Sequence, residues 1–437
     1  MLMVISNCWA LLFGMGLIML GNGLQGSLLG VRASIEGFGL TTTGLIMTGY
    51  YIGLIGGAAV VPKMVGRVGH VRSFGALASL ASTSILVHVV FIDPWVWWAM
   101  RLVTGFSYAG LYVVAESWLN DASENETRGE LLSIYMLISL GGAAGGQFLL
   151  NVAAPSGVEL FVLISVLVSF AVIPILLSAS KAPNFETSES VSISQLFRVS
   201  PLGVFGMLVS SIAIGAIFSV GSVYASAIGL SVQEISFFMG SMILGGVLSQ
   251  YPLGKISDQI GRRSVIIGTC LAGTVLSILA SQFVGVGWQL YAVVAIIGAL
   301  SMPLYSLCAA HTNDYLSPPQ MVAASGTLVL VSGMGASMGP AVTAFAMDSL
   351  GAQAFFYSIA MSLGLVAVFG LWRATRRSAV AQEDQGDFVV MAPTPISAAF
   401  NPDVELDEIV AAGDIDAAAV QVSFEELADE LKQSDEN

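Results

Sequence analysis

The chain has 437 residues, of which 55% are hydrophobic and only 10% are charged, and its mean hydropathy is +0.83. Because an average soluble domain carries about 25% charged residues, this composition excludes a soluble enzyme and a disordered protein. The net charge of −14 would repel a phosphate backbone, so no nucleic-acid partner is expected. The unit to count is therefore the membrane-spanning helix, which needs about 20 apolar residues.

Taken in chain order, twelve apolar runs are long enough to span a bilayer. Short clusters of Gly, Pro, Asn and Asp separate them, which predicts antiparallel neighbours joined by tight connections. The sequence thus indicates an all-α polytopic membrane protein with two six-helix bundles. The predicted spans cover residues 4–31, 40–62, 72–92, 94–118, 129–152, 158–180, 201–229, 232–254, 263–284, 286–311, 321–346 and 351–373.

Lysine and arginine are distributed unequally between the predicted connections. Twelve basic residues lie in the connections on one side of the membrane, whereas only Arg32 and Arg101 lie on the opposite side or within a span. Since positively charged loops remain in the cytoplasm, both termini are predicted to be cytoplasmic in a multi-pass protein of the cell (inner) membrane. The basic side carries Lys63, Arg67, Arg72, Arg128, Lys181, Arg198, Lys255, Arg262, Arg263, Arg373, Arg376 and Arg377.

Two polar stretches define the predicted domains. Residues 181–200 form a cytoplasmic linker between an N-terminal bundle at 1–180 and a C-terminal bundle at 201–375. Residues 376–437 form a mostly disordered cytoplasmic tail with 15 acidic and 3 basic residues, so the tail supplies nearly all of the net charge. Ser423 and Glu426 form a capping-box pattern, which predicts a short terminal helix. This tail is either a solvated acidic appendage or a docking element.

An internal repeat relates the two halves. Residues 105–147 align without a gap with residues 298–340, so that Asn120-Asp121 meets Asn313-Asp314. The halves are therefore copies with the same orientation. Parallel repeats of six spans build transporters whose substrate site lies between the halves, near the middle of the bilayer.

The segment Gly254-Lys-Ile-Ser-Asp258-Gln-Ile-Gly261-Arg262-Arg263 resembles the loop motif of the major facilitator superfamily (MFS), Gly-x-x-x-Asp-x-x-Gly-Arg-Lys/Arg. The alternative interpretation is that the basic residues of this segment only contribute to the positive charge that cytoplasmic loops usually carry. In the first half, Gly66 stands where the motif has Asp. The resemblance implies a conformational latch that stabilises the outward-open state. The implied latch residues are Gly254, Asp258, Gly261, Arg262, Arg263 and Asp314, with Arg67, Gly69, Arg72 and Asp121 in the first-half copy.

Arg101-Leu-Val-Thr104-Gly105 resembles a second motif of this superfamily, Arg-x-x-x-Gly. Counted from Asp93, Arg101 lies about 12 Å along its helix. An arginine at that depth costs at least about 2.5 kcal/mol, so it normally faces a partner or a wet cavity. The resemblance implies a role beside the cavity in proton coupling, and the alternative is a structural or snorkelling arginine. Further tracts, such as Glu116-Ser-Trp-Leu-Asn120, resemble the YcaD-like bacterial branch.

The resemblance implies a cavity lined by spans one, four, seven and ten. Alternatively, each polar side chain in these spans has a structural role only, in which it packs in the core or forms a hydrogen bond between helices. Spans one, seven and ten carry no embedded acid, so the available carboxylates are Glu36 and Glu116. The candidates for the substrate and proton pathway are Asn22, Gln25, Glu36, Arg101, Tyr108, Tyr112, Glu116, Tyr224 and Tyr305.

These observations predict a secondary transporter of a small organic solute that works by alternating access, with proton-coupled efflux as the favoured mode. Arg101 favours an anionic or neutral amphipathic substrate. Uptake, facilitated diffusion, lipid translocation and a transporter-derived sensor that signals through the tail are the alternatives. No Walker loop, metal pattern or catalytic elbow occurs in the sequence, so no enzyme, cofactor or metal is expected. The expected partners are the lipid bilayer, a substrate and protons, and we expect a monomer.

Overall fold

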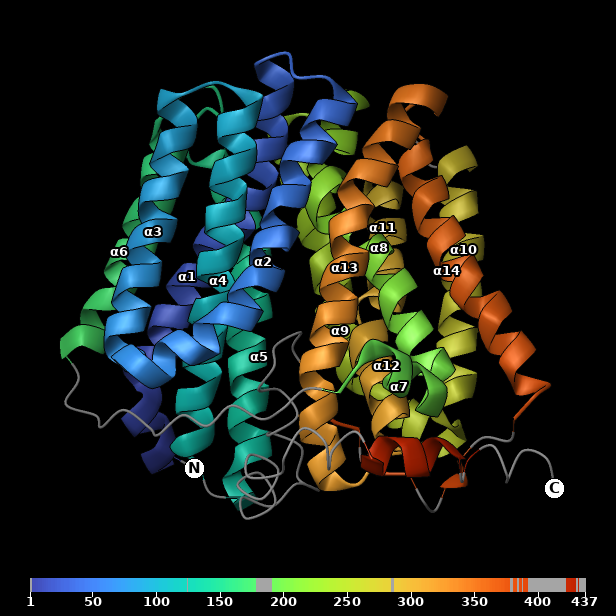
Figure 1. Cartoon of the computed structure of the whole chain (residues 1–437). Helices are drawn as coiled ribbons and strands as arrows, with labels where there is room; N and C mark the ends of the chain where they lie inside the picture. The colour runs from blue at the N-terminus through green and yellow to red at the C-terminus, as the bar shows by residue number, and fades with distance from the viewer. Residues whose placement is uncertain are drawn as a thin grey trace.

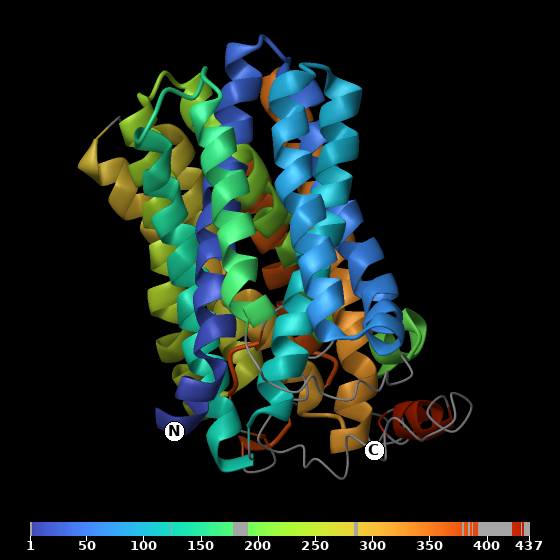
Figure 2. The same ribbon diagram turned by 90° about the vertical axis from the view of Figure 1, so that its left-hand side faces the viewer.

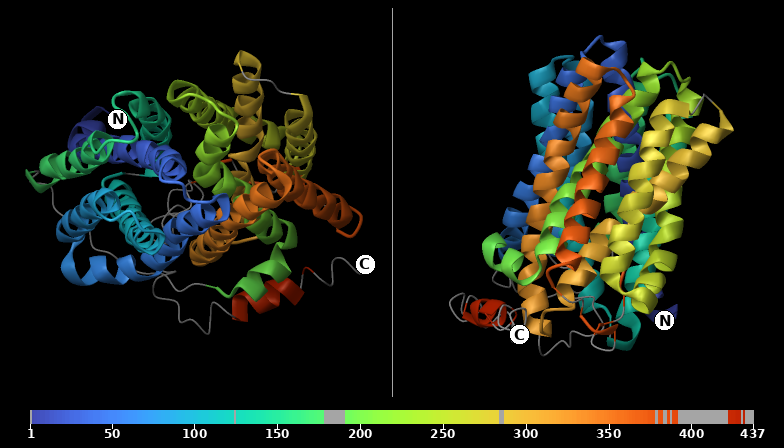
Figure 3. Two further views of the ribbon diagram at one scale, coloured as in Figure 1. Left: turned by 90° about the horizontal axis from the view of Figure 1, so that it is seen from above. Right: turned by 90° about the vertical axis from the view of Figure 1, so that its right-hand side faces the viewer.

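The computed structural model describes residues 2–123, 125–177, 191–283, 287–377, 380–382, 385–386, 388–391, 422–429 and 431. Nearly all regular structure in these ranges is α-helical, and the long helices run along one common axis (Figures 1 and 2). Seen from above, two bundles lie side by side (Figure 3). The start of the first helix and the end of the last long helix lie at the same end of the molecule, which we call the terminal face (Figure 1).

Each bundle contains six segments of spanning length. The first comprises α1 (Leu2–Ile35), α2 (Leu40–Val68), α3 (His70–Val90), α4 (Pro94–Asp121), α5 (Asn125–Phe148) extended by η1 (Leu149–Asn151), and α6 (Glu159–Leu177). The second comprises α8 (Pro201–Ala227), α9 (Val232–Ile260), α10 (Arg262–Phe283), α11 (Trp288–Ser301) with α12 (Leu304–Asn313), α13 (Pro318–Leu350) and α14 (Ala354–Ala374).

Every predicted span coincides with a helix or a pair of helices, but some boundaries differ. The helices α2 and α9 each run six residues beyond prediction, because α2 continues past Pro62 and α9 continues past Gly254 into the loop motif. Span ten is interrupted at Met302 and Pro303, where proline cannot donate a backbone hydrogen bond. By length and composition, eleven helices among the described residues qualify as membrane spans, and the more polar α4, with Arg101 and Glu116, does not.

Two short helices lie outside the bundles. Within the predicted linker, α7 (Ile193–Val199) begins at a capping box of Ser192 and Gln195, a signal that the sequence analysis missed. In the tail, residues 422–429 form the predicted helix, which lies at the terminal face (Figure 2). Its Phe424 side chain is fully buried, and Gln320 at the start of α13 donates to the Ser423 hydroxyl at 3.3 Å. The tail therefore contacts the membrane body.

The internal repeat is reproduced in the packing of the glycines. A Cβ on Gly105 of α4 would overlap the carbonyl oxygen of Tyr50 in α2, and a Cβ on Gly298 of α11 would overlap that of Met242 in α9. Such small residues allow membrane helices to approach closely. The same correspondence relates the pairs Gly23–Ala143 to Gly215–Ala336, and Gly146–Leu20 to Gly339–Ile212.

The two halves meet through helices of opposite bundles near the face that lies away from the termini. Gly44, near the start of α2, lies directly against Pro340 of α13. Gly240, near the start of α9, lies against the ring of Phe148 at the end of α5. Deeper in the bundle, Ala144 of α5 and Ile243 of α9 belong to one small buried cluster.

We expect Gly298→Ala to lower the stability of the protein. The added methyl group would overlap the backbone of α9, and overpacking of this kind typically costs about 1–3 kcal/mol. Gly268→Ala is the matched control, because a Cβ at Gly268 of α10 meets only open space. Thermal unfolding in detergent measures both. Equal midpoints for the two variants would contradict the tight α9–α11 contact.

Candidate functional site

Close packing between α2 and α4 places Arg101 over an aromatic ring. Gly105 lies one turn after Arg101 on the same face of α4. On α2, a Cβ added to Gly49 would lie only 3.3 Å from the Cβ of Arg101. With the helices this close, the guanidinium carbon of Arg101 is 4.4 Å from the centre of the Tyr50 ring. The Arg-x-x-x-Gly spacing therefore has a direct structural role, because Gly105 lets the arginine reach the neighbouring helix.

Three tyrosines and an asparagine complete this site, which we call the Arg101 cluster: Arg101, Tyr50, Tyr108, Tyr112 and Asn22. The Tyr108 ring lies 6.3 Å from Tyr50 and 6.2 Å from Tyr112, centre to centre. Asn22 of α1 donates from Nδ2 to the Tyr112 hydroxyl at 3.1 Å and to the Tyr50 hydroxyl at 3.4 Å. The cluster thus joins α1, α2 and α4.

The charge of Arg101 has no carboxylate partner in the described part of the chain. Its side chain is 4% exposed, and its Nε atom is buried without a hydrogen-bond acceptor. The ion pairs between described residues involve Arg32 and Arg262 instead. A cation over an aromatic face gains about 2 kcal/mol when desolvated, which offsets only part of the cost of burial. The contacts of the cluster therefore leave the charge of Arg101 uncompensated within the described part of the chain.

The structure brings only some of the predicted cavity residues together. Asn22, Arg101, Tyr108 and Tyr112 meet in the Arg101 cluster. Tyr224 of α8 does not join them, because it packs in a separate aromatic group, with its ring 4.9 Å from Phe355. Two other candidates also remain apart from the contacts of the cluster, namely Gln25, which is buried on α1, and Tyr305, which is half-buried on α12.

Tyr50 is the residue of this site that the sequence analysis missed. The predicted cavity was restricted to spans one, four, seven and ten, whereas Tyr50 belongs to α2. One signal was available, since Tyr50 directly follows Gly49 in a helix that also contains Gly53, and both glycines lie against α4. An aromatic residue beside such a close helix contact is well placed to meet a side chain of the partner helix.

The two candidate carboxylates have different surroundings. Glu36 forms an ion pair with Arg32 at 2.7 Å, and Arg32 also donates to the carbonyl oxygen of Pro155 at 3.1 Å. Glu36 thus helps to tie the end of α1 to the connection between η1 and α6. Glu116 is fully buried in α4, and its side chain forms a hydrogen bond with the side chain of Tyr135 in α5. Only Glu116 lies within the helical bundle.

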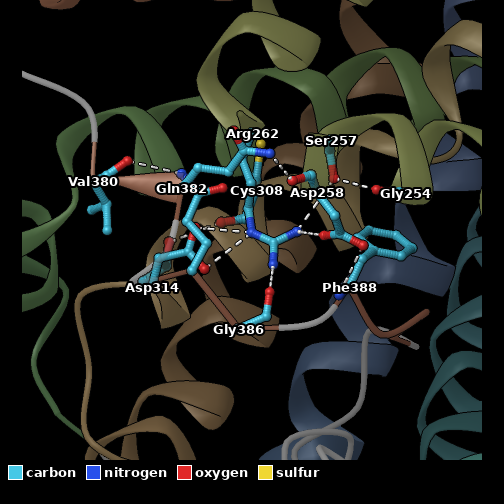
Figure 4. A network of polar contacts seen from close by, with 12 residues as sticks. Gly254, Ser257, Asp258, Arg262, Cys308, Asp314, Val380, Gln382, Gly386 and Phe388 are labelled. Atoms are coloured by element: carbon cyan, nitrogen blue, oxygen red, sulfur yellow. Dashed lines mark hydrogen bonds and ion pairs between the residues drawn. The ribbon is translucent and has the colours of Figure 1, made fainter. Parts of the chain in front are cut away.

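The second-half loop motif forms a charged network at the terminal face (Figure 4). Arg262 is 1% exposed, and its Nε donates to both oxygens of Asp314, at 3.0 and 2.9 Å. Its Nη1 donates to Asp258 at 3.0 Å. Gly261, with φ of 88°, supplies the left-handed turn between α9 and α10. Burial raises the pKa of the Asp314 carboxyl to about 6 although Arg262 acts in the opposite direction, so its negative charge depends on that arginine.

The first-half copy has the same turn but no equivalent network. Gly69 has φ of 90°, close to that of Gly261. Arg67, Arg72 and Asp121 are exposed, and no ion pair links them to other residues within the described ranges. Because Gly66 replaces the expected Asp, the arginines lack the carboxylate that binds Arg262 in the second half. The other arginine of the second-half motif, Arg263, donates to the carbonyl oxygen of Arg377 at 2.6 Å.

A helical membrane body of two repeated halves, with a buried polar cluster in one of them, is the architecture of a secondary transporter. The sequence profile of the Major Facilitator Superfamily matches residues 11–240 and again residues 203–404. The chain therefore belongs to this superfamily, which consists of transporters and not of enzymes.

Individual relatives agree with this assignment. The uncharacterized MFS-type transporter YcaD of Escherichia fergusonii is 26% identical over 370 residues, which cover 84% of this chain and 96% of YcaD. The nucleoside transporter NupG, in a mutant form, has a TM-score of 0.73 at 12% identity, with 83% of this chain and 98% of NupG covered.

A bacterial homologue of the human lysosomal transporter Spinster, in an inward-facing and occupied conformation, has a TM-score of 0.66 at 14% identity. The match covers 87% of this chain and 98% of the homologue. The two structural matches share the fold alone. The predicted superfamily, the resemblance to YcaD and the multi-pass membrane location are confirmed.

We expect Asp314→Asn to destabilise the second half. The change leaves the buried charge of Arg262 with one carboxylate fewer, and breaking a buried ion pair typically costs about 3–5 kcal/mol. Asp121→Asn is the matched control, because Asp121 occupies the equivalent position in the first half and is exposed. Thermal unfolding of both variants in detergent tests this expectation. A midpoint for Asp314→Asn as high as that for Asp121→Asn would contradict it.

Proposed function

We propose that this transporter exports a small organic anion, or a neutral amphipathic solute, across the bacterial inner membrane in exchange for protons. The observation that carries the proposal is the buried guanidinium of Arg101, which lies on an aromatic face and has no carboxylate partner among the described residues. The distribution of Lys and Arg supports cytoplasmic termini, and the bacterial relatives support the inner membrane.

The Arg101 cluster favours a particular class of substrate. A carboxylate or similar group beside Arg101 would restore the charge balance that this buried cation lacks, and would accept a charge-assisted hydrogen bond. The rings of Tyr50, Tyr108 and Tyr112 offer apolar faces for an aromatic or aliphatic body. A cationic substrate would meet like charge in a site of low dielectric constant, which disfavours it.

Glu116 is the residue that we propose as the proton carrier. Glu116 is fully buried in a membrane helix and forms a hydrogen bond with Tyr135, and ionisable residues inside membrane proteins commonly belong to proton pathways. Glu116 lies 15 residues after Arg101 on the same helix, which places it about 22 Å further along the axis. Substrate and proton would therefore bind at separate places on α4, and a movement of α4 would link them.

The seam between the halves supports alternating access. The contacts of α2 with α13 and of α5 with α9 lie near the face away from the termini. A rocking motion of one half against the other would open this seam and close the terminal face, exposing the Arg101 cluster to each side in turn. The second-half network around Arg262 lies at the terminal face, where such a motion would change its surroundings.

We expect Arg101→Ala to abolish binding and transport of anionic substrates. Purified protein is first screened by thermal shift against aryl carboxylates and their uncharged carboxamides, and the best ligand is then assayed for flux in proteoliposomes. Arg101→Lys retains charge but loses the planar group that covers Tyr50, so we expect it to retain only part of the affinity. A wild-type flux in Arg101→Ala would remove the cluster from the substrate site.

We expect Glu116→Gln to uncouple transport from protons. The amide keeps the size of the side chain but cannot release a proton, so a pH gradient should no longer drive flux while counterflow of substrate continues. The measurement is flux in proteoliposomes with and without a pH gradient, and Glu36→Gln is the control. If Glu116→Gln responds to the gradient as the wild type does, another group carries the proton.

A further inference from the structure

A short segment after α14 returns to the membrane body and binds the network of Arg262. We call its described residues, which lie within 380–391, the strap. Gly386 offers its carbonyl oxygen to Nη2 of Arg262, and the amide of Phe388 donates to Oδ2 of Asp258 at 3.4 Å (Figure 4). Gln382 donates to the last free carbonyl oxygens of α9, those of Asp258 at 2.8 Å and Gln259 at 2.6 Å.

The side chain of Phe388 occupies a position created by a glycine. A Cβ placed on Gly254 of α9 would overlap the Phe388 ring (Figure 4). A glycine in the middle of a helix costs about 1 kcal/mol relative to alanine. At this position the missing side chain gives the aromatic ring direct access to the backbone of α9, so Gly254 of the loop motif is also a seat for the strap.

The face of α9 that carries Gly254 is the face that meets the first half elsewhere. Gly254 follows Gly240 by 14 residues, which is about 3.9 helical turns, so the two glycines point in nearly the same direction. At Gly240 this face packs against Phe148 of α5. The α5–α9 seam continues through the cluster of Ala144 and Ile243, against which Val247 packs. Towards the terminal face, Phe388 covers the same side of α9.

The far end of the strap enters the interior of the second half. The backbone amide of Met391 donates to the hydroxyl of Ser306 at 3.1 Å, and that hydroxyl lies 3.2 Å from the Met391 carbonyl oxygen. Met391 is 6% exposed and Ser306 is 1% exposed. Ser306 belongs to α12, beyond the break at Met302 and Pro303. The strap therefore connects the terminal ends of α9 and α10 with α12.

We propose that the strap is an autoinhibitory wedge: Phe388 fills the seam between α9 and α5 at the terminal face and prevents that face from closing until the strap is released. For the terminal face to close, α5 must approach the part of α9 that lies between Val247 and the terminal face. The Phe388 ring now lies against this part of α9, at Gly254. The amide of Phe388 also occupies an acceptor of Asp258, which a helix end of the first half could otherwise use. The strap thereby holds the transporter in one conformation, whatever its substrate.

The test measures the distance across the terminal face and needs no substrate. Spin labels are attached at Glu130→Cys in α5 and Ile256→Cys in α9, both exposed, after the buried Cys8, Cys270 and Cys308 are changed to alanine. Double electron–electron resonance in nanodiscs then gives the distribution of distances between the two spin labels. In the full-length parent we expect one predominant long distance.

Two variants release the strap in different ways. Phe388→Ala removes the wedge, and Ser306→Ala removes the hydroxyl that binds Met391 with little change in volume. Both should add a second, shorter distance, whereas Val422→Ala, at an exposed site of the tail helix, should not. The proposal is overturned if the two strap variants give the parent distribution, or if Val422→Ala shifts it equally. Because no flux is measured, this result is independent of the proposed substrate and of proton coupling.

Discussion

A guanidinium group buried in a membrane protein must find its partners inside the protein, and this constraint organises both polar sites of the chain. Arg262 meets it with two carboxylates, so its charge is compensated and the group acts as a fixed link between α9, α10 and α12. Arg101 meets it with the face of Tyr50 and a shell of tyrosines, which leave its charge uncompensated by any described carboxylate. Since a buried cation in this second situation gains most from an added anion, the same residue type serves structure in one half and is suited to ligand binding in the other.

The repeat makes this contrast possible because it keeps the backbone packing and leaves the side chains free to differ. Gly105 and Gly298 bring equivalent helices together in the two halves. The positions that correspond to Arg101 and Tyr50 are Val294 and Met242, so the second half has the close helix contact without the cation or the ring. Conversely, Asp314 binds Arg262 whereas Asp121 is exposed. The Arg101 cluster and the Arg262 network thus arise from one repeated bundle by a few substitutions on a shared scaffold.

The sequence predicts much of the fold because membrane spans, positive loops and glycine spacing are local signals. The twelve spans and the motif around Arg262 could be read from neighbouring residues, and the repeat could be read from an ungapped alignment of the two halves. Tyr50 could not be assigned to the site in this way, since its contact with Arg101 depends on how closely α2 and α4 approach. The break at Pro303 was hidden within one continuous apolar run. The strap was missed because Phe388 follows a polar stretch, and its burial depends on a seat at Gly254 more than 130 residues earlier in the chain.

The location of the strap gives Gly254 and Asp258 two competing uses. In the proposed rocking motion, the surroundings of the loop motif at this position change with the conformation of the transporter. Here the tail supplies an aromatic ring for Gly254, an amide for Asp258 and a carbonyl oxygen for Arg262, and these groups all come from one short segment. A segment that satisfies three members of this motif at once stabilises the conformation in which it binds them, because all three contacts would be lost together when the seam closes. Because the strap follows α14 in the chain and is covalently joined to it, its local concentration stays high even when it is released.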